Sequence, residues 1–185
     1  SKAQKQSFIY LETYATSGAA ADLADFRRHY AVLESDRWAR DALASGHFDR
    51  EKVAQAFARG SVIPRAIPGM IFILQHFSSA PHISVALQAW YSTDDSIAEF
   101  AGIANELQAA HAGGGLSVAE LARQQARIQT LNSYIEPRTN VFSLEIAHGA
   151  VWVGTILFSS VLAAACIALL MWLSMARRIL ASVRG

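Results

Sequence analysis

The stretch "AVWVGTILFSSVLAAACIALLMWLSMARR", from Ala150 to Arg178, decides the fold of this chain. Between Gly149 and Ala176 the sequence contains no Asp, Glu, Lys, Arg or His. An uninterrupted apolar run of this length is typical of a helix that spans a lipid bilayer. Trp152 and Trp172 are separated by roughly 30 Å along such a helix, which is the thickness of a hydrocarbon core. We therefore expect these two tryptophans to mark the two membrane interfaces.

The charges on either side of this run predict its orientation. Three arginines follow it: Arg177, Arg178 and Arg184. The preceding flank carries only Glu145 and His148. The positive-inside rule then places the C-terminus in the cytoplasm and everything before Gly149 outside it. The predicted organisation is an extracytoplasmic domain over 1–148, a transmembrane helix over 149–176 and a cytoplasmic juxtamembrane segment over 177–185.

The composition of the remaining chain fits one packed domain. The whole sequence is 52% hydrophobic with a net charge of +1. Without the apolar run it has about 150 residues, enough for a core of its own. It contains no basic tract that would indicate nucleic-acid binding. The single cysteine, Cys166, falls inside the predicted span, which excludes a disulfide framework or cysteine catalysis in the outer domain.

Hydrophobic periodicity predicts an all-α fold, with no strand pattern of comparable strength. Glycines, prolines and capping residues divide the predicted elements. In chain order these are a helix around 8–15, a second through 23–33 that closes at Gly46, a third from Asp49 to Ala58, an ordered connection over 60–70, a compact apolar segment over 70–77, one helix from Pro81 to just before Gly113, and a final helix that begins with a capping box at Ser117 and Glu120. The outer domain is therefore expected to be a helical bundle.

The final helix is expected to continue into the membrane. No glycine occurs between Ser117 and Gly149, and Pro137 should kink this helix rather than end it. A continuous helix transmits displacement or rotation, whereas a glycine-rich tether would not. We therefore expect Pro137, His148 and Trp152 to lie on a signal-transmitting connection. The small residues of the run, such as Gly154 and Ser159, are equally consistent with pairing of two spans and with an ordinary span.

The N-terminal stretch "SKAQKQSFIYLETY" is already helical in pattern, without an initiator Met or a signal peptide. The expectation from this is that another span precedes it. A domain bracketed by two spans describes a transmembrane sensor, whose output domain would follow Gly185.

Several positions together resemble a known kind of protein region. They are "DRWARDAL" at 36–43, then Phe57, Gly60, Pro64, Ile67, Met70, Phe77, Pro81, Trp90 and Asp94, and "LN" at 131–132. This pattern resembles the helical sensor region of bacterial sensor histidine kinases and GGDEF/EAL-type cyclic-di-GMP enzymes. The resemblance implies a homodimer in the bacterial inner membrane, with the region before Gly149 in the periplasm. It departs from that pattern after Gly60, where Val62, Ile63 and Ala66 replace the usual Asn, His and Asp.

Five residues are candidates for ligand binding: Arg37, Arg40, Arg65, Trp90 and Asp94. Arg37 and Arg40 extend the apolar stripe of the second helix, where a guanidinium needs a carboxylate partner or an anionic ligand. Asp94 can contact a ligand, form an internal salt bridge of the Arg37–Asp94 type, or cap a helix. Trp90 can be a binding platform or a core residue, and Arg65 can meet an anion or remain solvated.

No metal or cofactor is expected. The six histidines have no helical i, i+4 pair or other spacing of metal ligands. This segment contains no nucleophile elbow, no phosphate-binding glycine loop and no kinase or cyclase motif. Catalysis is therefore expected only after Gly185. The favoured function is the input module of a membrane signal transducer that detects a small ligand or a periplasmic protein. The alternative is a membrane-anchored structural subunit of a larger complex that senses nothing.

Overall fold

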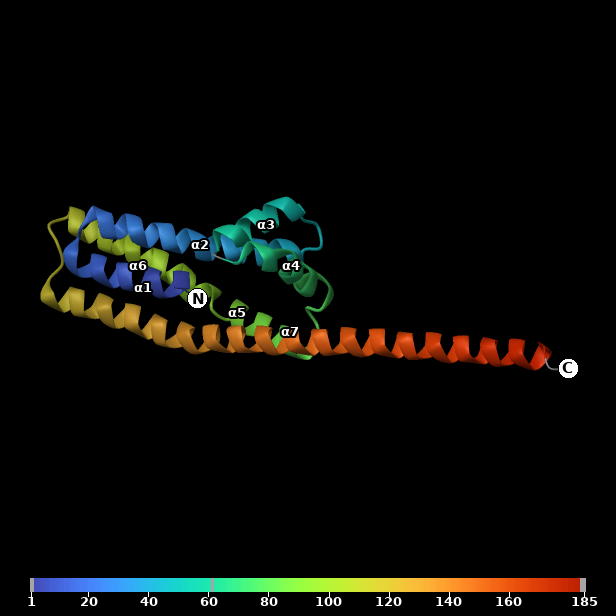
Figure 1. Ribbon diagram of the computed structural model, residues 1–185. Coiled ribbons are helices and arrows are strands. Elements are labelled where there is room, and N and C mark those ends of the chain that lie inside the picture. Colours follow the sequence, from blue (N-terminus) through green and yellow to red (C-terminus); the bar gives the residue numbers. More distant parts are fainter. Residues whose placement is uncertain (1, 61, 184–185) are drawn as a thin grey trace. The chain divides into compact units, whose positions relative to one another are not determined.

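The computed structural model describes residues 2–60 and 62–183, and the side chains of residue 176 and of residues 178–183 lie outside this description. The regular structure of the described residues is entirely helical, as the sequence predicts (Figure 1). In chain order the elements are α1 (Lys2–Ser17), α2 (Ala20–Ala44), α3 (Arg50–Arg59), the 3-10 helix η1 (Pro64–Ala66), α4 (Ile67–His76), α5 (Pro81–Tyr91), α6 (Asp94–Ala112) and α7 (Val118–Val183). The chain divides into two units, residues 1–145 and residues 146–185.

Four helices build the main core of the first unit. α1, α2, α6 and the first part of α7 lie side by side, and apolar residues of all four fill the space between them (Figure 1). The core residues are Leu11, Tyr14, Ala15, Leu23, Phe26, Phe100, Ile103, Ala104, Leu107, Ile128, Leu131 and Ile135. Each fully buried Leu, Ile or Phe stabilises the fold by about 1.5–3 kcal/mol relative to an exposed one. From α7 the buried residues of this core are Ile128, Leu131 and Ile135.

A second set of short helices packs at the C-terminal half of α2. α3 contacts α2 and α4, and α4 also contacts α2. The buried residues of these helices include Val53 and Phe57 from α3 and Ile71 from α4. The carboxylate of Asp49 accepts hydrogen bonds from the backbone N–H groups of the first turn of α3, so the predicted helix start is confirmed.

Two predicted element boundaries are wrong. The connection after Gly60 is shorter than expected, because α4 begins at Ile67 rather than at Met70. Pro68 lies in the first turn of α4, where a missing N–H costs nothing because helix N-termini leave those donors unpaired in any case. A proline that marks a loop by composition is therefore a helix-starting residue here.

The single helix expected from Pro81 to Gly113 is in fact two helices, α5 and α6, separated at Ser92 and Thr93. The hydroxyl of Ser92 donates to the carbonyl of Ala89, and that of Thr93 donates to the carbonyl of Trp90. Such side-chain to backbone hydrogen bonds compete with helical ones. The break leaves the next residue, Asp94, at the start of α6.

The start of α7 agrees with the sequence. Ser117 and Glu120 form a capping box, in which Glu120 accepts from the Ser117 N–H and the Ser117 hydroxyl accepts from the Glu120 N–H. The Ser117 hydroxyl also donates to the Glu120 carboxylate, and this hydrogen bond together with the one from the Ser117 N–H lowers the pKa of the Glu120 carboxyl. Pro137 lies inside α7 and does not end it. The helix therefore has no break between the first unit and the C-terminal apolar run.

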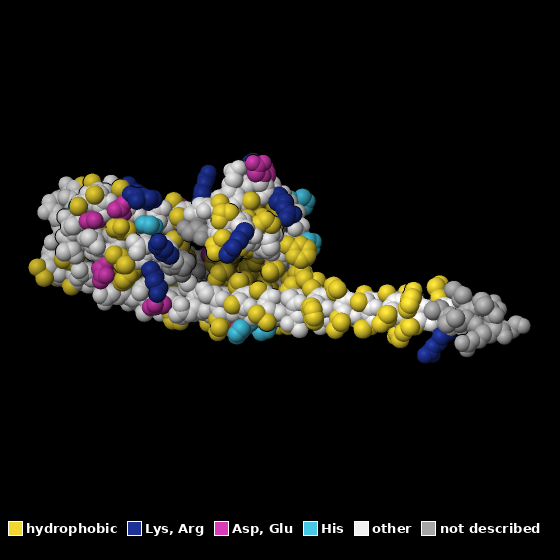
Figure 2. Space-filling view, viewed as in Figure 1, with side chains coloured by type: hydrophobic (Ala, Val, Ile, Leu, Met, Phe, Trp, Pro, Cys, Tyr) yellow, Lys and Arg dark blue, Asp and Glu magenta, His cyan; other side chains and the backbone are white. Residues whose placement is uncertain are grey.

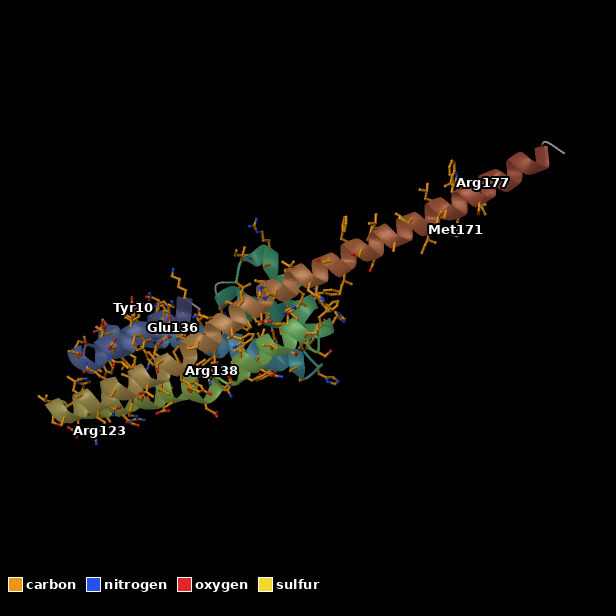
Figure 3. All side chains as sticks on the ribbon, turned by 90° about the horizontal axis from the view of Figure 1, so that it is seen from below. Tyr10, Arg123, Glu136, Arg138, Met171 and Arg177 are labelled. Carbon is orange, nitrogen blue, oxygen red and sulfur yellow. The ribbon has the colours of Figure 1, made fainter. Side chains whose placement is uncertain are left out.

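The second unit consists of the C-terminal part of α7. Among the described residues, α7 is the single continuous helix long and apolar enough to cross a membrane, and its most apolar window has no buried residue. Hydrophobic side chains cover the described part of this run in Figure 2. Met171 and Arg177 project from it in Figure 3. Two of the arginines used to predict the orientation, Arg178 and Arg184, lie outside the described side chains.

A candidate ligand-binding cavity

A cavity of about 190 Å³ opens in the first unit. The residues that line it come mainly from α2, α5, α6 and α7, and from the segment after α3. They are Gln4, Tyr30, Leu33, Glu34, Asp36, Arg37, Gly60, Val62, Met70, Ala89, Trp90, Thr93, Asp94, Ile97, Ile135, Arg138, Thr139 and Phe142. Most of this lining is apolar, and a few charged groups face it. This combination is typical of small-molecule sites.

Arg40 lies behind the cavity wall and is one of the most buried side chains of the protein, with 2% of its surface exposed. Its guanidinium donates to both carboxylate oxygens of Asp94, at 3.0 and 2.7 Å, and to Oδ1 of Asp41, at 2.9 and 2.7 Å. Burial alone would lower the pKa of Arg40, but the hydrogen bonds that it donates to Asp94 and Asp41 outweigh burial and raise the pKa. The buried charge is thus neutralised by a bidentate pair and a second carboxylate.

The guanidinium of Arg40 also stacks on aromatic rings. Its Cζ atom lies 3.9 Å from the ring centroid of Tyr91 and 5.1 Å from that of Trp90. Weakly hydrated guanidinium groups favour such contacts. Arg40 therefore ties the C-terminal half of α2 to the α5–α6 break and fixes the positions of Trp90 and Asp94 at the cavity.

Arg37 occupies the edge of the cavity with looser contacts. Its Nε atom lies 3.7 Å from Asp94 Oδ2 and 3.8 Å from Asp41 Oδ2, and its side chain is 47% exposed. An exposed ion pair at such a distance contributes little to stability. Asp94 therefore forms an internal salt bridge, one of the roles predicted for it. Arg40 is its main partner and Arg37 a secondary one.

Aromatic rings make up part of the cavity wall. Trp90 packs edge-on against Phe142 of α7, with 4.9 Å between the ring centroids. Tyr30 of α2 also lines the cavity, and burial together with the charge of Glu34 raises the pKa of its hydroxyl. Trp90 thus packs against another ring and also lines the cavity. A packing role and a role as a binding platform are therefore compatible for this residue.

Asp36 is the least compensated charged group of the cavity. Its Oδ1 atom is buried and has no hydrogen-bond partner among the described residues. Burial raises the pKa of its carboxyl from 3.8 to about 7. The carboxyl packs against Gly60, where a methyl group would overlap it. Gly60 is therefore needed at this position because only a residue without a Cβ leaves room for the Asp36 side chain.

Arg138 lines the cavity from α7, but its charge is engaged elsewhere. It donates to the carbonyl oxygen of Tyr134 at 2.8 Å, and its Cζ atom lies 3.4 Å from the centroid of the Tyr134 ring. Figure 3 shows its place along the helix. Together with Ile135, Thr139 and Phe142 it makes α7 a direct part of the cavity wall.

The structure brings most of the predicted site residues together. Arg37, Trp90 and Asp94 line the cavity, and Arg40 holds the last two from behind. Arg65 lies on η1, is exposed and does not belong to the lining. Among the predicted signal-transmitting residues, Pro137 lies in α7 between two lining residues, Ile135 and Arg138. His148 and Trp152 lie on α7 in the second unit and have exposed side chains.

Asp36 and Gly60 are two of the site residues that sequence reasoning missed. Asp36 follows Leu33 by three positions and precedes Arg40 by four, which places it on the same helical stripe as a buried leucine and a buried arginine. An acidic residue on an apolar stripe is the signal that could have found it. Its proximity to Gly60 could not have been predicted, because that contact joins separate elements.

Comparisons with protein-family models, with curated proteins and with solved structures found no match to this chain. Over residues 2–60 and 62–183 the regular structure is all-helical, with one continuous helix that could span a membrane and a cavity in the helical bundle.

Proposed function

We propose that this chain is the input module of a transmembrane signal transducer, in which occupation of the cavity changes the packing around α7. The single observation that carries this proposal is that α7 both lines the cavity and contains the apolar run. Four cavity-lining residues belong to it, and the same unbroken helix contains the apolar run. A helix that senses occupancy at one end and enters a membrane at the other is suited to couple the two.

The charges of the cavity suit a switch. A ligand shifts a two-state equilibrium only if it binds the two states with different affinity. Arg37 holds Asp94 and Asp41 at distances above 3.5 Å and can exchange these contacts at small cost. Arg40 instead anchors Asp94 with two short hydrogen bonds. Because Asp94 has a short ion pair with Arg40 and a longer one with Arg37, the contacts of Arg37 can change while the Arg40 pair maintains the fold.

In this proposal the bundle lies in the periplasm and the apolar run crosses the bacterial inner membrane, with Arg177 on the cytoplasmic side. Two copies associate through the membrane, and the output domain acts on the cytoplasmic side. The stimulus is a small molecule or a periplasmic protein. A membrane-anchored structural subunit is the rival function, and the following test separates the two.

The test joins residues 1–185 to the cytoplasmic part of a transmembrane histidine kinase, with several linker lengths, and reads kinase activity through a reporter gene. Ala89→Trp fills the cavity from α5. The matched control is Val85→Trp, one turn away on the same helix, where the side chain is 43% exposed and outside the lining. We expect the first variant to change the reporter signal severalfold and the second to leave it unchanged.

Insertions after His148 test the path of the signal. Four inserted glycines should abolish the difference between Ala89→Trp and the parent, because glycine destabilises a helix interior by about 1 kcal/mol per residue relative to alanine. Four inserted alanines keep the helix and add about one turn, so they should preserve a response. Equal reporter signals from both tryptophan variants at every linker length would refute the sensor proposal and favour the structural subunit.

A further inference from the structure

The chemistry of the cavity indicates which class of ligand it accepts. The first step is the balance of its charges. Asp94 is neutralised by Arg40 and Arg37, and Arg138 is engaged by Tyr134. The buried Oδ1 atom of Asp36 has no hydrogen-bond partner among the described residues. Burial raises the pKa of this carboxyl, and the charge of the N-terminal amino group, which lowers the pKa, has the smaller effect. A ligand that carries a positive charge would give the Asp36 carboxyl a hydrogen-bonding partner.

The second step is size. A dry apolar cavity of about 150 Å³ accommodates a benzene molecule. The cavity here, at about 190 Å³, has room for one ring and a short polar arm. Its walls include the aromatic residues Tyr30, Trp90 and Phe142 together with aliphatic side chains such as Leu33 and Ile135. These walls fit an apolar body rather than a sugar or a polyanion.

We propose that this cavity binds a small primary amine, whose protonated nitrogen pairs with the carboxylate of Asp36 while its aromatic or aliphatic body packs against Trp90 and Phe142. The inference rests on the proposed function, because it names the ligand class of the same cavity. Gly60 keeps Asp36 in place, and its substitution would displace the carboxyl that the amine needs.

The titration of Asp36 is consistent with this pairing. Burial raises the pKa of its carboxyl to about 7, so Asp36 is mostly protonated below that pH and ionised above it. An ammonium group stabilises the ionised form, and its binding therefore releases one proton near neutral pH. The other charged or titratable groups that line the cavity are Tyr30, Glu34 and Arg37 from α2, Asp94 from α6 and Arg138 from α7. The charge of the N-terminal amino group also acts on Asp36 and lowers the pKa of its carboxyl.

The experiment measures binding of benzylamine to the purified whole chain in lipid nanodiscs at pH 8, where Asp36 is ionised, by titration calorimetry. Benzyl alcohol and benzoate are the neutral and anionic probes of similar shape. The variant Ala89→Phe fills the cavity and supplies the baseline for partition into lipid. We expect saturable binding of benzylamine and roughly 10- to 100-fold weaker binding of benzyl alcohol, which is the usual difference for a hydrogen bond to a charged group.

Asp36→Asn is nearly isosteric and removes only the charge. It should weaken benzylamine binding by the same roughly 10- to 100-fold and change the affinity for benzyl alcohol by less than about threefold. The control Asp95→Asn changes an exposed carboxylate outside the lining and should leave both affinities unchanged. Should Asp36→Asn fail to fold, the wild-type chain provides an independent readout: benzylamine affinity should fall about tenfold per pH unit below pH 7.

Three results would overturn the inference: no saturable binding of benzylamine, tighter binding of benzoate than of benzylamine, or equal benzylamine affinity in wild type and Asp36→Asn. These results are independent of the reporter assay. Amine binding without any reporter response to Ala89→Trp would reject the sensor function and keep the ligand class. A reporter response without amine binding would keep the sensor function and reject the ligand class.

Discussion

Replacing Asp36 by Asn should remove a pH dependence of stability that this single carboxyl creates. Burial raises the pKa of Asp36 to about 7 in the folded protein, whereas an unfolded chain restores its ordinary value of 3.8. Between these two pH values the folded state holds a proton that the unfolded state has lost. Stability therefore falls as pH rises through this window and is constant above it.

The size of the effect follows from the gap between the two pKa values. The gap is about three pH units, and each unit corresponds to 1.36 kcal/mol. Asp36 thus lowers the free energy of unfolding by up to about 4 kcal/mol at pH 8 relative to pH 4. This value is an upper bound, because the side chain as a whole is only partly buried and water reaches part of it.

The assay is urea unfolding of the whole chain in nanodiscs from pH 4.5 to pH 8, followed by far-UV circular dichroism. The free energy of unfolding of Asp36→Asn minus that of wild type isolates Asp36, since all other titrating groups cancel. This difference should rise with pH up to about 7 and then level off. Asp95→Asn, which changes an exposed carboxylate, should give a curve parallel to wild type. Parallel curves for Asp36→Asn as well would refute the assignment of Asp36 as a buried, unpartnered acid.

Three further changes test the structure around the cavity. Asp94→Ala should destabilise the fold by about 3–5 kcal/mol, because it leaves the guanidinium of Arg40 buried without its bidentate partner. Chemical denaturation measures this loss, and a value below about 1 kcal/mol would contradict the burial of the pair. Gly60→Ala should displace the Asp36 carboxyl, which predicts loss of the pH dependence described above in the same urea assay. Ser117→Ala should cost about 0.5–2 kcal/mol by removing the cap of α7, with the loss detected as a lower midpoint in thermal unfolding.

The regular elements were largely predictable because local signals define them. Asp49 and Ser117 cap their helices where the sequence places them, and Gly18, with φ +62°, separates α1 from α2. The errors occurred where a local signal has two meanings. Pro68 lies in the first turn of a helix instead of in a loop. Thr93 interrupts a helix, since its hydroxyl donates to a backbone carbonyl, and Asp94, the next residue, pairs with Arg40.

The candidate site was predictable only in part. The apolar stripe of α2 singled out Arg37 and Arg40, since charged side chains on such a stripe need partners. It could not tell which of the two would be buried. That choice depends on where the α5–α6 break presents Asp94 and Tyr91, and those residues are 54 and 51 positions away from Arg40 along the chain.

By itself the sequence determined an all-helical chain with one apolar helix of membrane-spanning length, because periodicity, capping and unbroken hydrophobicity act over a few turns of helix. Only the tertiary structure decided which polar groups share a cavity and which buried carboxylate oxygen has no hydrogen-bond partner among the described residues. Asp36 acquires its raised pKa from side chains and backbone of separate elements that exclude water, and desolvation of this kind is a property of three-dimensional packing that no spacing along the chain encodes.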